Sequence, residues 1–211
     1  MFVAIFLVLN MIIHTKYCVM KFILFFSSIW LSVAGSAQSW AKQYDFVDEC
    51  SCGLALVSKD GKRGFVTKEG KLVIPVIYDD ALHFTEGMAA VKKDGKWGYL
   101  DSTGKEIVAP EYGDALSFSE GLAAIMKGGK YGFINSTGKI TIPLIYENAS
   151  GFSEGRAAIS KNGMWGFIDK TGKEMIPCVY GFAAPFSDGI ARVMKESKWI
   201  TIDITGKKIE E

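Results

Sequence analysis

The sequence predicts an all-β fold made of tandem 34-residue β-hairpin repeats. A glycine that follows an aromatic or equivalent position returns every 34 residues, and a second glycine, always followed by lysine, keeps the same step. In each unit a dipeptide typical of tight turns joins two apolar runs, and no segment after residue 37 has a helical period. A fixed period without insertions indicates a repeat architecture, in which each unit buries its apolar face against its neighbours. The glycines are Gly64, Gly98, Gly132 and Gly166 in the first series, and Gly70, Gly104, Gly138, Gly172 and Gly206 in the second.

Residues 1–37 have the pattern of an export signal. Met20 and Lys21 precede an apolar run that ends in the small residues Gly35 and Ala37, as in a cleavable secretory signal. A second apolar run precedes Met20, which makes Met20 a second candidate start. The alternative is that one or both runs remain as membrane anchors, although each is shorter than the roughly 20 apolar residues that span a bilayer. We expect an exported protein (periplasmic, cell-surface or secreted) without stable membrane insertion after cleavage.

The charge of the remaining chain is nearly balanced. Removal of residues 1–37 changes the formal net charge from +1 to −1, because it removes Lys16 and Lys21 and no acidic residue. A chain so close to neutral gives no reason to expect nucleic acid or an anionic membrane as a partner.

Three cysteines follow the signal region. Cys50 and Cys52 are too close in sequence for an unstrained bridge, so a disulfide would join one of them to Cys178. Three unpaired, half-buried thiols are the alternative. A metal site would need more ligands, and His83 is the only histidine after residue 37. We therefore expect neither a metal nor a cofactor.

Each unit begins with a hairpin. Its two-residue loop pairs Lys93 with Lys96, Val91 with Gly98 and Ala89 with Leu100. Both faces of the hairpin are apolar, so we expect both to be covered, with glycine where another backbone approaches closely. The aromatic residues are then core residues or, alternatively, platforms on which sugars stack. The turn dipeptides are Asp60-Gly61, Asp94-Gly95, Gly128-Gly129 and Asn162-Gly163, and the fifth copy, Glu196-Ser197, has lost the turn signal.

A further strand and a closing segment complete the unit. A turn at residues 101–104 leads to a strand at 106–108, whose copies meet proline at Pro75, Pro110, Pro143 and Pro177. The repeat domain spans 38–211, with a half unit at 44–53, full units at 54–87, 88–121, 122–155 and 156–189, and a half unit at 190–211. We expect an open, solenoid-like array. Because the two half units add up to one repeat, a closed five-unit propeller-like ring is the alternative.

The repeated motif resembles a known family. The pattern K-W-G-[YF]-[IL]-D-x-T-G-K, an aliphatic run with proline and tyrosine, and then F-S-E-G-[LM]-A are similar to the WG-repeat (KWG-repeat) proteins, from about Tyr44 to the end of the chain. The match is strongest at 96–108 and 164–176 and weakens at Arg63 and Ile200, which replace the tryptophan and the glycine. The resemblance implies a β-rich repeat module of bacterial envelope and secreted proteins, without an established catalytic activity.

Paired lysines are the candidate binding residues. At four hairpin tips two lysines lie side by side, and stacking the units would align them into a basic ridge able to attract an anionic polymer such as an acidic envelope glycan. Lysine at a hairpin tip also serves solubility and discourages edge pairing, which is the alternative. The pairs are Lys59 with Lys62, Lys93 with Lys96, Lys127 with Lys130, and Lys195 with Lys198.

The sequence contains no convincing catalytic constellation. His83 has no counterpart in the other units, and the Gly-Lys turns lead into strands, whereas a phosphate-binding loop leads into a helix. We therefore predict an exported, non-enzymatic β-repeat scaffold that binds a protein or polysaccharide partner in the cell envelope. The alternative is an envelope hydrolase or inhibitor built around a cleft in a closed β ring. The sequence determines neither the ligand nor the oligomeric state.

Overall fold

The computed structural model describes residues 39–48 and 53–209, which belong to the second of two compact units, Ala37–Glu211. The first unit, Met1–Ser36, lies outside the described residues, and so do the predicted export signal, Cys50 and Cys52. In the described part, no helix is both long and apolar enough to cross a membrane. A short 3-10 helix, η1 (Trp40–Gln43), precedes the strands.

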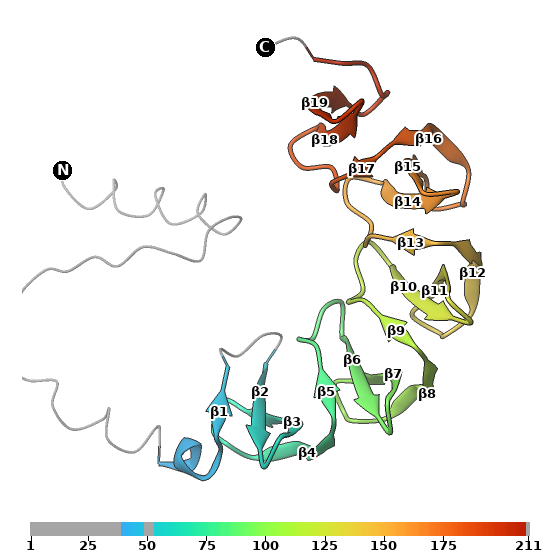
Figure 1. Ribbon diagram of the computed structural model, residues 1–211. Helices are drawn as coiled ribbons and strands as arrows, with labels where there is room; N and C mark the ends of the chain where they lie inside the picture. The colour runs from blue at the N-terminus through green and yellow to red at the C-terminus, as the bar shows by residue number, and fades with distance from the viewer. Residues whose placement is uncertain (1–38, 49–52, 210–211) are drawn as a thin grey trace, which may run out of the picture. The chain divides into compact units, whose positions relative to one another are not determined.

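Five antiparallel sheets follow one another along the chain, and in each sheet the strands pair in sequence order (Figure 1). The first sheet contains β1 (Phe46–Val47), β2 (Leu54–Lys59), β3 (Lys62–Thr67) and β4 (Leu72–Tyr78). The second contains β5 (Asp80–Ala81), β6 (Met88–Lys93), β7 (Lys96–Asp101) and β8 (Glu106–Tyr112). The third contains β9 (Asp114–Ala115), β10 (Leu122–Lys127), β11 (Lys130–Asn135) and β12 (Ile140–Tyr146). The fourth contains β13 (Asn148–Ala149), β14 (Ala157–Lys161), β15 (Met164–Ile168) and β16 (Glu174–Tyr180), and the fifth β17 (Phe182–Ala183), β18 (Ile190–Lys195) and β19 (Lys198–Asp203).

The central hairpin of each sheet has the predicted register. Lys93 pairs with Lys96, Val91 with Gly98 and Ala89 with Leu100. The turn residues Asp94 and Gly95 have φ angles of 50° and 76°, as a type I′ turn requires. The fifth hairpin, β18–β19, keeps this turn although Glu196 and Ser197, at φ 50° and 61°, carry side chains that disfavour it.

The glycine of the motif makes room for the fourth strand. A Cβ on Gly98 would lie 2.5 Å from the carbonyl oxygen of Val108 in β8, closer than non-bonded atoms approach. The register between β7 and β8 shifts at this point, in the strand that also contains Pro110. The prediction that glycine marks a close backbone approach is therefore confirmed.

The first strand of each sheet comes from the tail of the preceding sequence unit. Asp80 and Ala81 of β5, for example, pair with Lys92 and Val91 of β6. In the same way β1 pairs with β2, and within the described residues no strand of the first sheet pairs with a strand of the fifth. The described residues are therefore built as tandem sheets, and no strand pair among them closes the ring that the two half units suggested.

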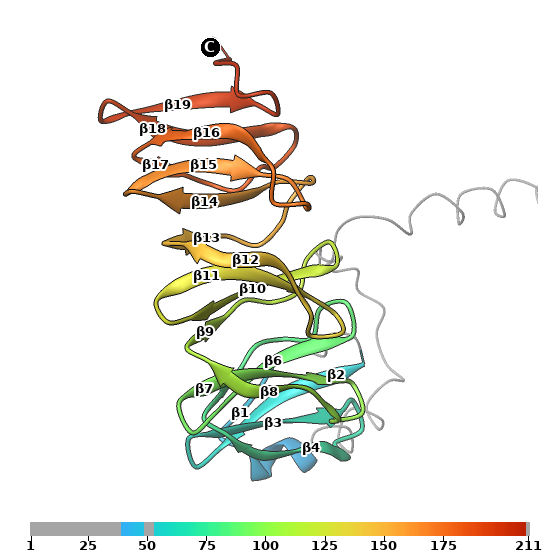
Figure 2. The ribbon, with the colours of Figure 1, turned by 90° about the vertical axis from the view of Figure 1, so that its right-hand side faces the viewer.

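The core lies between neighbouring sheets, which pack face against face (Figure 2). Trp97 and Tyr99 of the second sheet pack in one cluster with Ala123, Ile125 and Ile134 of the third. Both faces of the internal sheets are covered in this way, as their apolar character predicted. A recurring aromatic pair adds to each junction, with ring centroids 4.7–5.0 Å apart: Phe65 with Phe84, Tyr99 with Phe118, Phe133 with Phe152, and Phe167 with Phe186.

Candidate functional site

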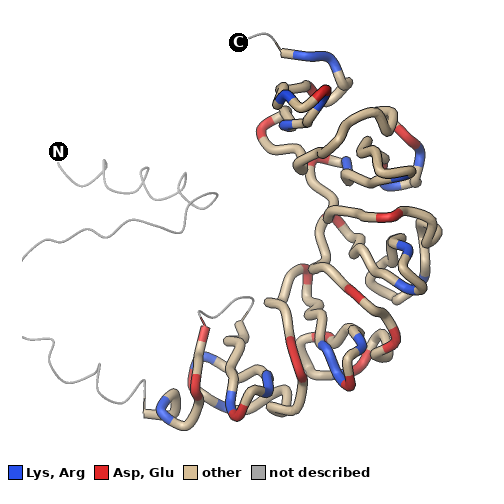
Figure 3. Tube along the Cα trace, viewed as in Figure 1, with Lys and Arg blue, Asp and Glu red and all other residues tan. Residues whose placement is uncertain are grey.

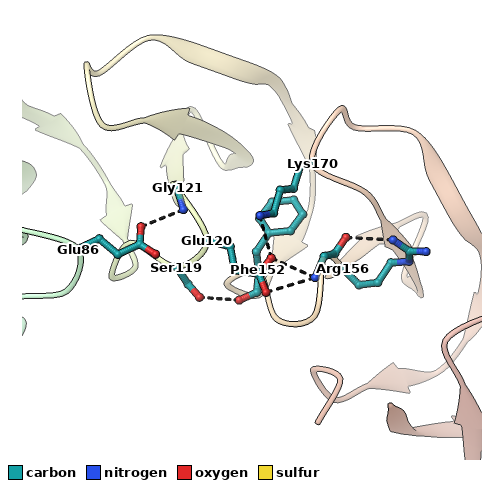
Figure 4. Close-up of polar contacts among 8 residues, drawn as sticks. Glu86, Ser119, Glu120, Gly121, Phe152, Arg156 and Lys170 are labelled. Atoms are coloured by element: carbon teal, nitrogen blue, oxygen red, sulfur yellow. Dashed lines mark hydrogen bonds and ion pairs between the residues drawn. The ribbon is translucent and has the colours of Figure 1, made fainter. Parts of the chain in front are cut away.

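The Phe-Ser-Glu-Gly loops are linked to one another along the array (Figure 4). In each link the glutamate of one loop accepts a hydrogen bond from the glycine amide of the next. Ser119 also donates to the carbonyl oxygen of Phe152 in the next loop at 2.7 Å, and Ser153 does the same to Phe186. These side chains therefore join the units. The three links are Gly121 to Glu86 at 2.9 Å, Gly155 to Glu120 at 3.0 Å and Gly189 to Glu154 at 2.9 Å.

Glu120 has an additional partner, because the ammonium group of Lys170 lies 3.0 Å from its carboxylate. Partial burial raises the pKa of Glu120, but the bonds from Lys170 and from the Gly155 amide outweigh it, so the pKa lies below its ordinary value. The ionised carboxylate is thus held as a structural acceptor between two units.

The polar residues of the Asp-x-Thr-Gly-Lys turns are also engaged in structure. Asp101 accepts hydrogen bonds from the amide of Thr103 at 2.9 Å, the hydroxyl of Thr103 at 2.6 Å and the amide of Lys105 at 3.0 Å. The bond from the Thr103 hydroxyl is the main reason why the pKa of Asp101 lies below its ordinary value. Asn135, Asp169 and Asp203 make the same three bonds in their turns.

The lysines at the hairpin tips are exposed and face each other across the ladder, but acidic neighbours form ion pairs with some of them. Figure 3 marks the positions of the basic and acidic residues along the chain. Lys62 pairs with Asp79, Lys127 with Glu111 at 2.7 Å and Lys130 with Glu147 at 3.9 Å. In the part of the chain that the structure describes, no carboxylate lies within 4.0 Å of Lys59, Lys93, Lys96, Lys195 or Lys198.

The acidic residues beside the tips were not among the predicted site residues. Asp79 also accepts a hydrogen bond from the amide of Gly95, and Glu147 from that of Gly163, at 3.2 and 2.8 Å. Each acid precedes its turn glycine by 16 residues, a spacing visible in the sequence. Asp79 directly precedes β5 and Glu147 directly precedes β13, and because these two-residue strands were not predicted, the spacing could not be interpreted from the sequence.

Cys178 and His83 are the remaining candidate residues from the sequence. Cys178 is half buried in β16, where burial raises the pKa of its thiol. Its pairing with Cys50 or Cys52 stays a prediction, because those two residues lie outside the described ranges. His83 contacts Asp48 at 3.1 Å and lines a 290 Å³ pocket beside Arg63, whose guanidinium is held by Asp80.

The repeated aromatic position differs in exposure between units. Trp97, with 7% of its surface exposed, belongs to the core between the second and third sheets. Trp199, its counterpart in the fifth sheet, is 47% exposed. The interpretation as core therefore holds for Trp97 but does not describe Trp199.

Together the fold and its linked loops define a tandem-repeat β protein, whose repeated polar side chains connect one sheet to the next. The chain belongs to the WG containing repeat family, whose sequence model matches five consecutive segments: residues 41–62, 64–97, 97–131, 131–165 and 165–199. No curated protein matches the chain.

Solved structures are similar to this chain at low sequence identity. A eukaryotic initiation factor is 13% identical with a TM-score of 0.52, over 74% of this chain and 50% of that one. Hsv2 of Kluyveromyces lactis is 9% identical with a TM-score of 0.51, over 75% and 59% of the two chains. The extracellular domain of a one component system from B. thetaiotaomicron is 12% identical with a TM-score of 0.46, over 78% and 28%. This protein thus spans less than two thirds of each of these chains, and the likeness concerns the fold alone.

Proposed function

We propose that this protein is an exported, non-enzymatic scaffold that binds a protein or polysaccharide partner in the cell envelope, with an anionic polysaccharide favoured. The observation that carries the proposal is the pairing of Lys93 with Lys96 and of Lys195 with Lys198 at exposed tips, where among the described residues no carboxylate lies within 4.0 Å of their ammonium groups. Two adjacent ammonium groups attract a polyanion, whereas an ion-paired lysine does so weakly.

The structural role of the recurring polar residues supports the proposal of a scaffold. The loop glutamates and the turn aspartates, which recur in every unit or nearly so, form bonds within the protein. Within the described residues, no three His, Cys, Asp or Glu side chains gather in a group that could hold a metal ion. We therefore assign binding to exposed side chains that make no such bonds within the described part of the protein, among them the tip lysines Lys93, Lys96, Lys195 and Lys198.

Salt-dependent binding to an acidic polysaccharide tests the proposal. We expect the chain without its signal region to bind polygalacturonate, with affinity that falls steeply as salt rises. The double substitution Lys93→Ala with Lys96→Ala should weaken binding. Lys105→Ala with Lys139→Ala removes the same charge from exposed turn residues away from the tips and is the matched control. Equal weakening by both pairs, or binding that is insensitive to salt, would contradict the role of the tips.

The position of the mature N-terminus tests the proposal of export. The protein recovered from the envelope or medium of its host should begin near Gln38, which N-terminal sequencing would show. Recovery of an uncleaved chain from the membrane fraction would instead support the anchor alternative.

A further inference from the structure

One face of the fifth sheet carries exposed aromatic and aliphatic side chains. Phe182, Trp199 and Ile190 are 43%, 47% and 41% exposed. The strand pairing places Phe182 beside Met194 and Met194 beside Trp199, so these side chains share one face. In the second sheet the same face is packed against the third, and Met88 and Trp97, the counterparts of Ile190 and Trp199, are 6% and 7% exposed.

Arg192 shows that this face is not made to be covered by another repeat unit. Its counterparts in the three internal sheets are Ala90, Ala124 and Ala158, each at most 1% exposed against the next sheet. A guanidinium group in such a junction would be buried without a partner, and burial of an unpaired charge destabilises a protein by roughly several kcal/mol. The presence of arginine at position 192 therefore indicates that the outer face of the fifth sheet is exposed to solvent.

Ile200 marks a second difference of the fifth sheet. Its counterparts are Gly64, Gly98, Gly132 and Gly166, where a Cβ would lie 2.5–2.6 Å from a carbonyl oxygen of the fourth strand. Ile200 packs against the core cluster between the fourth and fifth sheets. Beyond it the chain returns to β19, where Lys208 bridges Ile202 and the amide of Ile209 donates to the carbonyl oxygen of Thr201. The edge of β19 is thus partly paired, and Arg192 is the residue that argues against a further repeat on the outer face.

The exposed rings form a corner with a cation beside it. The rings of Phe182 and Trp199 are 5.7 Å apart and nearly perpendicular, at 73°, and Trp165 supports Phe182 from behind at 5.4 Å. The guanidinium carbon of Arg192 lies 5.2 Å from the centre of the Trp199 ring. Among the described residues no carboxylate lies within 4.0 Å of Arg192, and Lys195 and Lys198 lie at the tip of the same hairpin.

We propose that Phe182, Trp199 and Arg192 form a binding site for an acidic sugar residue of a polysaccharide. The apolar C–H face of a pyranose ring packs on an aromatic ring, and the corner offers two rings at an angle. The carboxylate of a hexuronic acid matches the forked donors of a guanidinium, which an aromatic face pre-orients. This inference rests on the proposed function and names its ligand class and its site.

The charges argue against a second copy of the chain as the occupant. A two-fold contact through this face would repeat the same patch on both sides, so that two unpaired Arg192 side chains would share one interface. An acidic sugar instead brings the charge that the site lacks. Sedimentation of the free protein separates the two possibilities.

Three single variants test the site, with polygalacturonate and neutral dextran as probes. Trp199→Ala removes an exposed ring, and we expect its dissociation constant for polygalacturonate to rise about tenfold or more, while Trp199→Phe keeps part of the affinity. Arg192→Ala installs the residue of the internal units, so the fold is retained, and we expect the preference for polygalacturonate over dextran to decrease, with the tip lysines supplying the remainder. Ile145→Ala removes an equally exposed apolar side chain on β12 and should bind as the parent does.

Parent-like binding by Trp199→Ala would overturn the inference. So would a dimer of the parent that Trp199→Ala converts to a monomer with unchanged glycan binding. If Lys93→Ala with Lys96→Ala loses binding while Trp199→Ala keeps it, the proposed function is supported and the proposed sugar site is refuted. If the parent binds no acidic polysaccharide at low salt, both fail.

Discussion

Glu120 in the loop before β10 accepts a hydrogen bond from the amide of Gly155 at 3.0 Å, across the junction between the third and fourth sheets. The two residues are 35 positions apart, one repeat plus one residue. The same link recurs from Glu86 to Gly121 and from Glu154 to Gly189. A short polar loop thus connects each unit to the next beside a junction that is otherwise apolar.

The link makes Glu120 more important for stability than its position in an open loop suggests. Glu120→Gln keeps the shape but removes the charge shared with Lys170, and we expect a loss of about 1–2 kcal/mol in the free energy of unfolding. Glu86→Gln is the matched control, because Glu86 accepts the amide bond but has no lysine within 4.0 Å among the described residues, and its loss should be smaller. Urea denaturation measures both, and a larger loss for Glu86→Gln would contradict this explanation.

The turn carboxylates make stability depend on pH in the acidic range. The pKa of Asp101, of Asp169 and of Asp203 lies below the ordinary 3.8, so the stability that they confer is complete above that value and is lost as the pH falls through the lower folded-state values. We expect the urea midpoint to be constant near neutral pH and to drop below pH 3.8.

Asparagine in the third unit supplies the control for this pH dependence. Asn135 makes the same three hydrogen bonds without a charge, so Asp101→Asn gives the second unit a turn that already exists in the protein. The variant should fold and show a shallower drop of the urea midpoint in acid. An unchanged acid profile would show that Asp101 does not contribute.

Gly98, where β7 and β8 approach closely, should not tolerate replacement by a residue with a side chain. Gly98→Ala places a Cβ 2.5 Å from the Val108 carbonyl oxygen, and we expect a loss of about 2–4 kcal/mol in the free energy of unfolding. In Gly181→Ala the nearest atom is 3.8 Å from the new Cβ, so the change should stay within about 1 kcal/mol. Thermal melts of the two variants compare them directly, and equal stability would refute the steric argument.

The hairpins were predictable because their cause is local. A two-residue turn fixes the pairing of Lys93 with Lys96, and the alternation of side chains then places Gly98 on a defined face. The first strands were missed because strands such as Asp80–Ala81 contain two residues, too few to show an alternating pattern. Once that strand is missed, the origin of each sheet in two sequence units cannot be seen.

The site was less predictable because it depends on contacts between units. Trp97 and Trp199 occupy the same place in the repeat, and only the presence or absence of a covering sheet makes one core and the other surface. Likewise, Lys62 and Lys93 look alike in sequence, but Asp79 neutralises only the first.

Fluorescence quenching of single-tryptophan proteins tests most directly the claim that internal repeats form a core while the fifth sheet binds the ligand. Two proteins that retain only Trp97 or only Trp199, with phenylalanine at the other tryptophan positions, would be titrated with acrylamide with and without polygalacturonate. We predict that Trp97 is protected throughout and that Trp199 is accessible until the polysaccharide protects it. Equal quenching of the two residues, or quenching of Trp199 that the polysaccharide leaves unchanged, would contradict the claim.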